Sequence, residues 1–473
     1  MDRLKALDAV FIDAEDEDPN TSMAIASITI FEGPIPTHKE ALSFLGSRLT
    51  LVPRYRQKLR AVPLRLGRPV WVDDPNFDLT YHVRRVGLPK PGRDKQLADL
   101  VGWVMSQRLD RDHPLWEYWF VEGLSRGRWA LIAKVHHCMV DGIAGTDMYR
   151  LILDIETEPP APPPAAGDGA TEDELSAVSL LAEAGTDMAR LVVRDALAIS
   201  AAVTSPRQTI RQAAALGRAA ARLYPSLWPA VSSSLSGQIG RQRRYTWARA
   251  SLEDIKTIKR EFGGTVNDVV LAAIASGFRA LLLKRGEEPE AHEVPSLVPV
   301  SVRAPGDEGV CGNQVSAAIA NLPVHVADPV ERLAAVRAEL GSLKESRESL
   351  IGEGLTVLGQ FSPYPLASRW VRAAFSLPQR EIVTVTTNVP GPRQPLFLAG
   401  RKLQEIIPYV PIASRVRTGI SILSYCDNMA FGITGDFAAN PDLDVLARGI
   451  EHGVSELLTA AAEHAREEHA PAD

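Results

Sequence analysis

Two adjacent histidines, followed by an acid, have the residue types and spacing for acid–base chemistry. Residues 136–142 read HHCMVDG. Imidazole is largely neutral near pH 7, so His137 or its neighbour could serve as a general base. Asp141 could close the turn, hold an arginine or fix the tautomer of an imidazole, and Gly142 permits a tight backbone where a helix starts.

Other chemistries compete for this motif. A pair of hydrogen-bonded structural histidines is the simplest alternative, and the local sequence leaves it open. A metal site would need further ligands, and no other histidine stands at ligand spacing nearby. The sequence has no Gly-x-Ser-x-Gly elbow, and it gives no reason for the Cys138 thiol to be activated, so a covalent nucleophile is not indicated.

The motif lies on the turn between a predicted strand at 130–135 and a predicted helix at 142–155. Neighbouring side chains at a strand end point to opposite sides, so one histidine can face a cavity while the other packs inward. Periodicity predicts helices at 39–51, 266–284 and 328–343, and strands at 23–31, 245–250, 297–302, 315–322, 382–387, 419–424 and 429–434. Strands and helices in both halves predict an α/β layered architecture used twice.

A break in composition separates the two halves. Residues 159–169 read PPAPPPAAGDG, which is typical of an extended linker. Between residues 190 and 249 the only acid is Asp195, and arginine pairs four residues apart share a helical face. This face could be solvated or could lean on anionic lipid, and both interpretations stay open. The predicted organisation is an N-terminal domain (1–158), a linker and helical crossover (159–243) and a C-terminal domain (244–473).

Composition excludes several classes of protein. The chain has 473 residues, 45% of them apolar, with 52 basic and 58 acidic side chains and a net charge of −6. This balance does not favour nucleic-acid binding. Its three cysteines are too far apart in sequence for a disulfide framework. An acidic N-terminus and the lack of a long uncharged apolar run predict a cytoplasmic protein that meets lipid only from the surface.

The HHxxxDG pattern resembles the signature of the chloramphenicol-acetyltransferase and condensation-domain superfamily. Further segments narrow the resemblance to the bacterial wax ester synthase/diacylglycerol acyltransferase family. These segments are LDAVF (7–11), PLWE (114–117), VEGL (121–124), TVNDVVLAA (265–273), PVSVR (299–303), GNQ (312–314), TNVPGP (387–392) and FGITGD (431–436). They are collinear over nearly the whole chain, so together they are far more specific than any one alone.

The resemblance implies two chloramphenicol-acetyltransferase-like α/β domains packed in a V, with a tunnel at their interface and His137 inside it. The implied reaction moves a long-chain acyl group from acyl-CoA to the hydroxyl of diacylglycerol, of a long-chain alcohol, or of both. His137 would be the general base, and no acyl-enzyme would form. Acyl-CoA would be a substrate, with no cofactor and no metal.

The resemblance also implies roles for other residues. His136 would support His137, Gly142 would shape the turn, and Asp141 would be structural, ion-paired with Arg303. Seven residues are candidates for substrate contact: Pro114, Leu115, Trp116, Asn267, Asp268, Thr387 and Asn388. Thr387 or Asn388 could stabilise the oxyanion. Core packing is the alternative for the PLW segment, and helix capping is the alternative for the Asn-Asp pair.

Two other functions remain open at this point. The same architecture could acylate a polyketide diol or a sugar lipid, or it could be a non-catalytic protein of lipid droplets. In each case the expected partners are lipidic, and the expected location is the inner membrane face or the surface of a lipid droplet.

Overall fold

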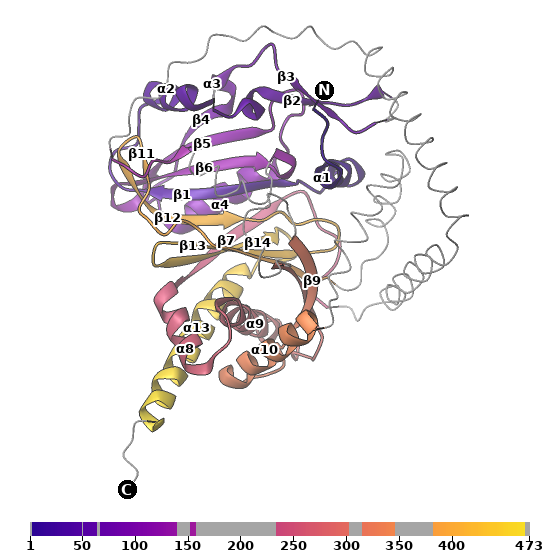
Figure 1. The fold of residues 1–473 in the computed structure, drawn as a ribbon, viewed down its shortest axis with the longest axis vertical. Coiled ribbons are helices and arrows are strands. Elements are labelled where there is room, and N and C mark those ends of the chain that lie inside the picture. The colour runs from indigo at the N-terminus through magenta and orange to yellow at the C-terminus, as the bar shows by residue number, and fades with distance from the viewer. Residues whose placement is uncertain are drawn as a thin grey trace, which may run out of the picture.

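In a computed structural model, the chain forms two sheets with helices packed around them (Figure 1). The structure describes residues 2–49, 51–63, 67–139, 152–157, 233–301, 315–345 and 382–468. Within these ranges each main sheet has six strands, and a separate hairpin joins β2 (Gln57–Arg60) to β3 (Val70–Asp73). The predicted α/β class is confirmed.

The first sheet carries the histidine motif on a central strand. Its order is β11-β12-β1-β6-β5-β4. The bounds are β1 (Ala24–Phe31), β4 (Val83–Gly87), β5 (Trp116–Leu124), β6 (Arg128–His136), β11 (Phe397–Leu398) and β12 (Arg401–Tyr409). Nearly every side chain of β6 is buried, because other elements cover both faces of this strand. Helices α2 (His38–Leu49) and α3 (Leu79–His82) lie on the outer side of this sheet (Figure 1).

The second sheet has the order β7-β14-β13-β10-β8-β9. Its strands are β7 (Arg243–Ser251), β8 (Val294–Ser301), β9 (Val315–Leu322), β10 (Thr384–Val389), β13 (Thr418–Tyr425) and β14 (Asn428–Asp436). Helices α8 (Leu252–Phe262), α9 (Val266–Lys284), α10 (Pro329–Glu345) and α13 (Leu443–Glu468) cover the face that points away from the first sheet (Figure 1). The predicted elements at 266–284 and 315–322 match α9 and β9 in both bounds.

Strands β11 and β12 cross between the two halves. Residues 397–409 fall within the predicted C-terminal domain, yet β12 pairs antiparallel with β1, for example Ile407 with Ile28. An unpaired β1 would leave an open sheet edge beside the motif, and β12 closes it. The sequence did not predict this exchange, because strand pairing over such a distance has no local signal.

The two sheets meet tightly where β12 passes over β14. A Cβ added to Gly432 would lie 1.7 Å from the Pro408 carbonyl oxygen, so only glycine fits there. The Tyr245 hydroxyl donates a hydrogen bond to the same oxygen at 2.7 Å. One continuous core cluster contains residues of α1 (Ala6–Glu17), α4 (Asp94–Ser106), β7 and β12. The halves are therefore packed together through apolar contacts.

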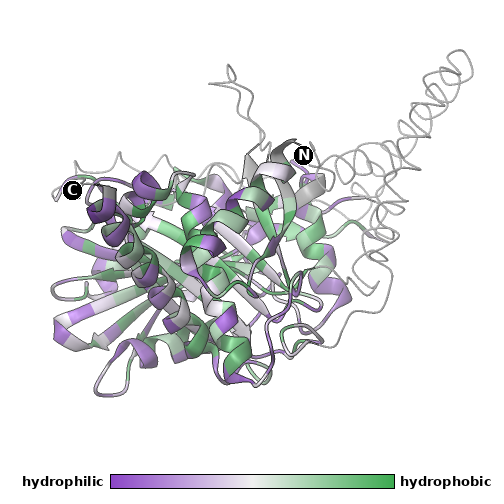
Figure 2. Ribbon diagram, turned by 90° about the horizontal axis from the view of Figure 1, so that it is seen from below, coloured by the Kyte–Doolittle hydropathy of each residue, from purple (hydrophilic) through white to green (hydrophobic). Residues whose placement is uncertain are grey.

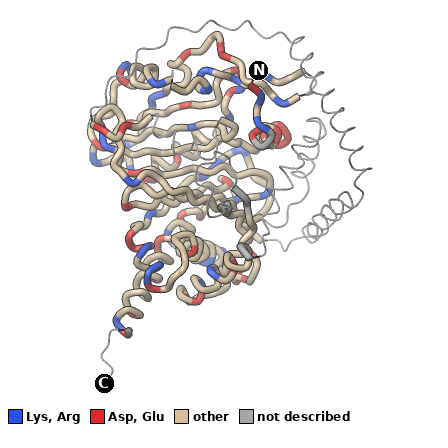
Figure 3. Tube along the Cα trace, in the orientation of Figure 1, with Lys and Arg blue, Asp and Glu red and all other residues tan. Residues whose placement is uncertain are grey.

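Polarity follows these layers. Apolar residues concentrate on the inner strands and inner helix faces (Figure 2), and charged residues gather on helices and loop ends, with acids prominent on α1 (Figure 3). By length and composition, α9 could cross a membrane, but 72% of its most apolar window is buried inside the protein. It is the central helix of the second core cluster.

Candidate active site

The two motif histidines stand where β6 ends and a short 3-10 turn, His137–Met139, begins. Flanking strands hold this end of β6 through the backbone. The His136 N–H donates to the Leu115 carbonyl at 2.9 Å, and the His137 N–H donates to the Met23 carbonyl at 3.0 Å. The turn is therefore anchored on one side to the segment before β5 and on the other to the segment before β1.

His136 packs inward and is only 1% exposed. Its Nδ1 accepts a hydrogen bond from the Cys138 N–H at 3.2 Å, so the ring proton belongs on Nε2. Nε2 lies 3.4 Å from Glu15 Oε1, an electrostatic contact longer than an ideal hydrogen bond. His136 is therefore a buried ring that is hydrogen-bonded at Nδ1 and lies beside Glu15 at Nε2, and its supporting role stays a prediction.

Glu15, on α1, is a site residue that sequence reasoning missed. Its Oε1 accepts a hydrogen bond from the Met23 N–H at 2.7 Å, and its Oε2 lies 3.1 Å from Arg111. Burial alone would raise the pKa of Glu15, but the contacts with His136, Met23 and Arg111 outweigh burial and lower it to about 2. Glu15 is therefore a charged, buried anchor for both the imidazole of His136 and the backbone that holds His137.

His137 is less buried than His136 and keeps part of its surface accessible. Its ring stacks on Phe11 with centroids 4.0 Å apart. Because most of the ring is removed from water, desolvation lowers the pKa of His137 to about 4; a backbone hydrogen bond opposes this shift, and the nearby His136 adds to it. Nδ1 is buried, and no hydrogen-bond partner of good geometry is found for it among the described residues. His137 is therefore neutral near pH 7, as a general base must be.

Phe11 and Glu15 are one helical turn apart, so a single face of α1 contacts both histidines. Phe11 belongs to the LDAVF segment that carried part of the resemblance. The i, i+4 spacing of Phe11 and Glu15 places the two side chains on one helical face, and it is the only local signal that could have linked Glu15 to the motif. The adjacent Cys138 is buried, and burial raises the pKa of its thiol, which argues against a thiolate nucleophile.

The PLW segment leads into β5 beside the motif. Trp116 pairs with Val135 across the β5–β6 ladder, and its indole N–H donates to the Tyr55 carbonyl at 2.8 Å. Pro114, Leu115 and Trp116 are all buried. Their contacts are those of core residues that support the histidine turn, and their contact with substrate stays a prediction.

The second sheet brings two predicted site residues together. The Asn388 amide, on β10, donates to Asn267 Oδ1 at 3.2 Å, although the residues are 121 positions apart in sequence. Thr387 is half-buried on the same strand. Among the described residues, no hydrogen bond, ion pair or ring contact joins this pair to His137. Their roles in substrate and oxyanion binding stay predictions.

Asp268, by contrast, has a clear structural partner. Its carboxylate accepts from the Thr265 N–H at 2.6 Å, and its own N–H donates to Thr265 Oγ1 at 3.2 Å. This is a capping box at the start of α9. The structure does not describe several predicted residues, so their roles stay predictions. These are Asp141, Gly142, Arg303 and the arginine-rich part of the crossover.

Fold and site together define an α/β acyltransferase of the HHxxxDG type. The protein-family model for the wax ester synthase/diacylglycerol acyltransferase (WS/DGAT) catalytic domain matches residues 4–270. The family model for the WS/DGAT C-terminal domain matches residues 311–458. The chain belongs to this family, and the resemblance read from its motifs is confirmed.

Relatives match over almost the full length. A probable diacylglycerol O-acyltransferase of Mycobacterium tuberculosis is 40% identical over 458 residues, covering 97% of this chain and 96% of the relative. The solved wax ester synthase/diacylglycerol acyltransferase of Marinobacter aquaeolei is 26% identical, covers 98% of this chain and 100% of that one, and superposes with a TM-score of 0.69. The first condensation domain of the CDA synthetase, 16% identical with a TM-score of 0.58, shows the shared fold alone and covers 98% of this chain and 96% of that domain.

Proposed function

We propose that this acyltransferase moves a long-chain acyl group from acyl-CoA to the hydroxyl of diacylglycerol, of a long-chain alcohol, or of both. The names of the relatives support these acceptors. The observation that carries the mechanism is His137, whose ring is partly accessible and is kept neutral by its surroundings. A neutral imidazole can accept the hydroxyl proton, whereas an imidazolium cannot.

The proposed reaction has a single transfer step and balances without a further reagent. Because Nδ1 is buried, Nε2 of His137 is the nitrogen that takes the proton from the acceptor hydroxyl. The oxygen attacks the thioester carbonyl carbon, the C–S bond breaks, and the same proton passes to the leaving thiolate of CoA. Holding both substrates beside one base converts a bimolecular encounter into an oriented reaction.

The raised pKa of the Cys138 thiol supports direct transfer without an acyl-enzyme. A single-turnover experiment with labelled palmitoyl-CoA and no acceptor tests this point. We expect no label on the protein after denaturation. Stoichiometric label that diolein or hexadecanol then removes would contradict direct transfer.

His137→Ala is the central test of the base. We expect the rate with diolein or hexadecanol to fall by about 10²–10⁴-fold, the usual contribution of a positioned general base. His452→Ala is a matched control, because the His452 side chain is 71% exposed and pairs with Glu456 on the surface. Unchanged turnover in a folded His137→Ala protein would refute the mechanism.

The acceptor and the location are further parts of the proposal. If a folded, intact protein rejects every simple lipid alcohol, an acceptor such as a polyketide diol or a sugar lipid is favoured. If it binds lipid and forms no ester with any donor, the non-catalytic alternative is favoured. Because both proposed acceptors are lipids, we propose that the protein works at the inner membrane face or on lipid droplets, which cell fractionation can test.

A further inference from the structure

A basic pocket lies far from the histidine turn, at the junction of the two halves. Its volume is about 770 Å³, and it is formed by the loop before α4, the turn between β5 and β6, and the ends of β7 and β12. Arg128 begins β6 and His136 ends it. Eight residue steps along a strand place them about 26 Å apart. Packed core side chains fill the space between α4 and β7, so the pocket is separate from the proposed active site.

The pocket concentrates positive charge on a chain of net charge −6. Five cationic side chains and two carboxylates line it, a formal excess of three positive charges. The cations are Arg93, Lys95, Arg126, Arg128 and Arg249. Such an excess inside a concave surface attracts anions more strongly than the same charges spread over a flat one.

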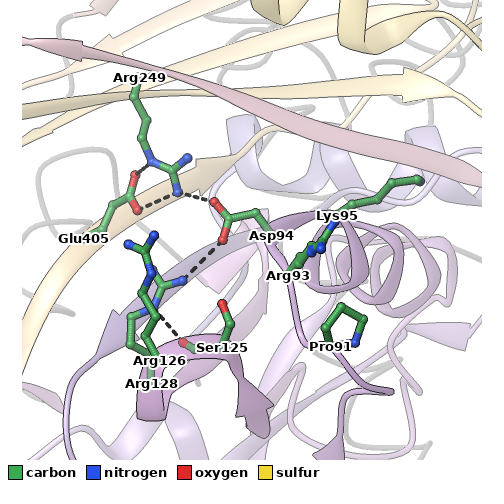
Figure 4. A pocket seen from close by; sticks show the side chains of 9 residues that line it. All are labelled: Pro91, Arg93, Asp94, Lys95, Ser125, Arg126, Arg128, Arg249 and Glu405. Atoms are coloured by element: carbon green, nitrogen blue, oxygen red, sulfur yellow. Dashed lines mark hydrogen bonds and ion pairs between the residues drawn. The ribbon is translucent and has the colours of Figure 1, made fainter.

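Both carboxylates are already engaged, as Figure 4 shows. Arg249 grips Glu405 through two hydrogen bonds of 2.7 and 3.0 Å, and it contacts Asp94 at 2.8 Å. Asp94 also lies 3.6 Å from Arg128. The two acids therefore bind Arg249 and Arg128, which form the wall of the pocket, and neither acid pairs with Arg93 or Arg126.

Arg93 and Arg126 are those free cations. Both are exposed at the pocket, and neither side chain has an ion-pair partner or a hydrogen-bond acceptor among the residues that the structure describes. Lys95 differs, because it pairs with Asp99 at 3.0 Å. A guanidinium group with unused donors can bind phosphate oxygens in a bidentate manner, and Arg93 and Arg126 each offer one to the pocket.

The backbone that carries these arginines is held rigidly. The Ser125 N–H donates to the Gly92 carbonyl at 2.8 Å, which ties the two loops together. A Cβ on Gly92 would lie 1.9 Å from the Gly123 carbonyl oxygen. Arg126 itself has φ 65°, a left-handed conformation that costs free energy for a residue with a side chain. The two loops that carry these arginines are therefore fixed relative to each other.

We propose that this pocket binds the phosphate group of a phosphorylated ligand, with Arg93 and Arg126 as its principal contacts. The phosphate could belong to a soluble compound or to the headgroup of a phospholipid, and the two share the chemistry that the arginines recognise. The site is independent of the proposed transfer reaction, and binding alone tests it.

The test uses the full chain and two probes. Calorimetry measures its binding to inorganic pyrophosphate. Flotation measures its binding to phosphatidylcholine vesicles with and without phosphatidate. The test variant is Arg93→Gln with Arg126→Asn. Asn tolerates the left-handed conformation, so the turn is preserved. Lys259→Gln with Lys284→Gln is the matched control, since both lysines are exposed, lie outside the pocket and carry the same total charge.

We expect the test variant to weaken binding by roughly tenfold for each lost guanidinium, with an unchanged or raised melting temperature, while the control binds as the parent does. Pyrophosphate binding lost only in the test variant identifies a soluble ligand. Phosphatidate-dependent flotation lost only in the test variant identifies a lipid headgroup. If the parent binds neither probe, or if test and control variants bind equally, the proposal is refuted.

Discussion

Glu15 gives a sharp test of how the histidine turn is held, because its charge can be removed without changing its size. Its carboxylate contacts the Met23 N–H, Arg111 and His136 while being only 2% exposed. We predict that Glu15→Gln weakens both the fold and the reaction. The amide can still accept from Met23, but it cannot balance the positive charge of Arg111.

The magnitude follows from the pKa of this carboxyl, which is lowered from 4.5 to about 2 in the folded state. The folded protein therefore favours the charged form. The stabilisation is fully present above pH 4.5 and is lost as the pH falls toward 2. A pKa difference of this size corresponds to about 3 kcal/mol of unfolding free energy near neutral pH. It should shrink to about 1 kcal/mol near pH 3.

Urea unfolding followed by tryptophan fluorescence measures this difference at both pH values. Glu17→Gln is the control, because Glu17 is exposed at the end of the same helix. We also expect kcat of Glu15→Gln to fall by about tenfold with little change in KM, since the turn that positions His137 loosens. A loss of stability that is the same at both pH values, or that equals the loss in Glu17→Gln, would refute the reasoning.

Four other predictions concern separate parts of the molecule. Burial lowers the pKa of His137 to about 4, so kcat should stay level as the pH falls below neutral and should decline only near pH 4. A decline in kcat centred near pH 6.5, the ordinary pKa of histidine, would contradict this prediction. We expect the substitutions Asn267→Ala and Asn388→Ala each to slow transfer, and a double-mutant cycle to give a coupling free energy of about 1 kcal/mol. If the two effects on the rate are additive, the hydrogen bond between these residues has no role in the reaction. Gly432→Ala should cost more than about 3 kcal/mol in unfolding free energy, while Gly341→Ala, in open space on α10, should be neutral or stabilising. The arginine-rich crossover should bind anionic vesicles less strongly as salt rises, and equal binding to neutral vesicles would exclude this electrostatic attraction.

The sequence predicted the motif turn and most strands because their signals are local. The mainly apolar run at 130–135 predicted a buried strand, and these residues are buried in β6. Helix α9 has an apolar run and the Thr265–Asp268 capping box at its start. The two histidines differ in burial, as expected for neighbours at a strand end, although one face of α1 contacts both.

Contacts made over long sequence distances had no such signal. Glu15 contacts His136 only because α1 packs beside the end of β6, and an acidic helix has little apolar periodicity to identify its inner face. The pKa of His137 depends on the packing around its ring, which no pattern of neighbours in sequence encodes. The Asn267–Asn388 hydrogen bond and the β1–β12 pairing join segments whose proximity is a property of the fold.

The crossing strand explains why the two halves must act as one enzyme. β1 needs β12 to satisfy its outer edge, and β1 also begins at the backbone segment that holds His137 through Met23. The end of β12 is in turn fixed over β14, because the Pro408 carbonyl accepts a hydrogen bond from the Tyr245 hydroxyl and packs against Gly432. A movement of the second sheet would therefore reach the histidine turn through two strands in direct contact. An N-terminal half expressed alone would expose the edge of β1 next to the histidine turn, so we expect transfer to require both halves.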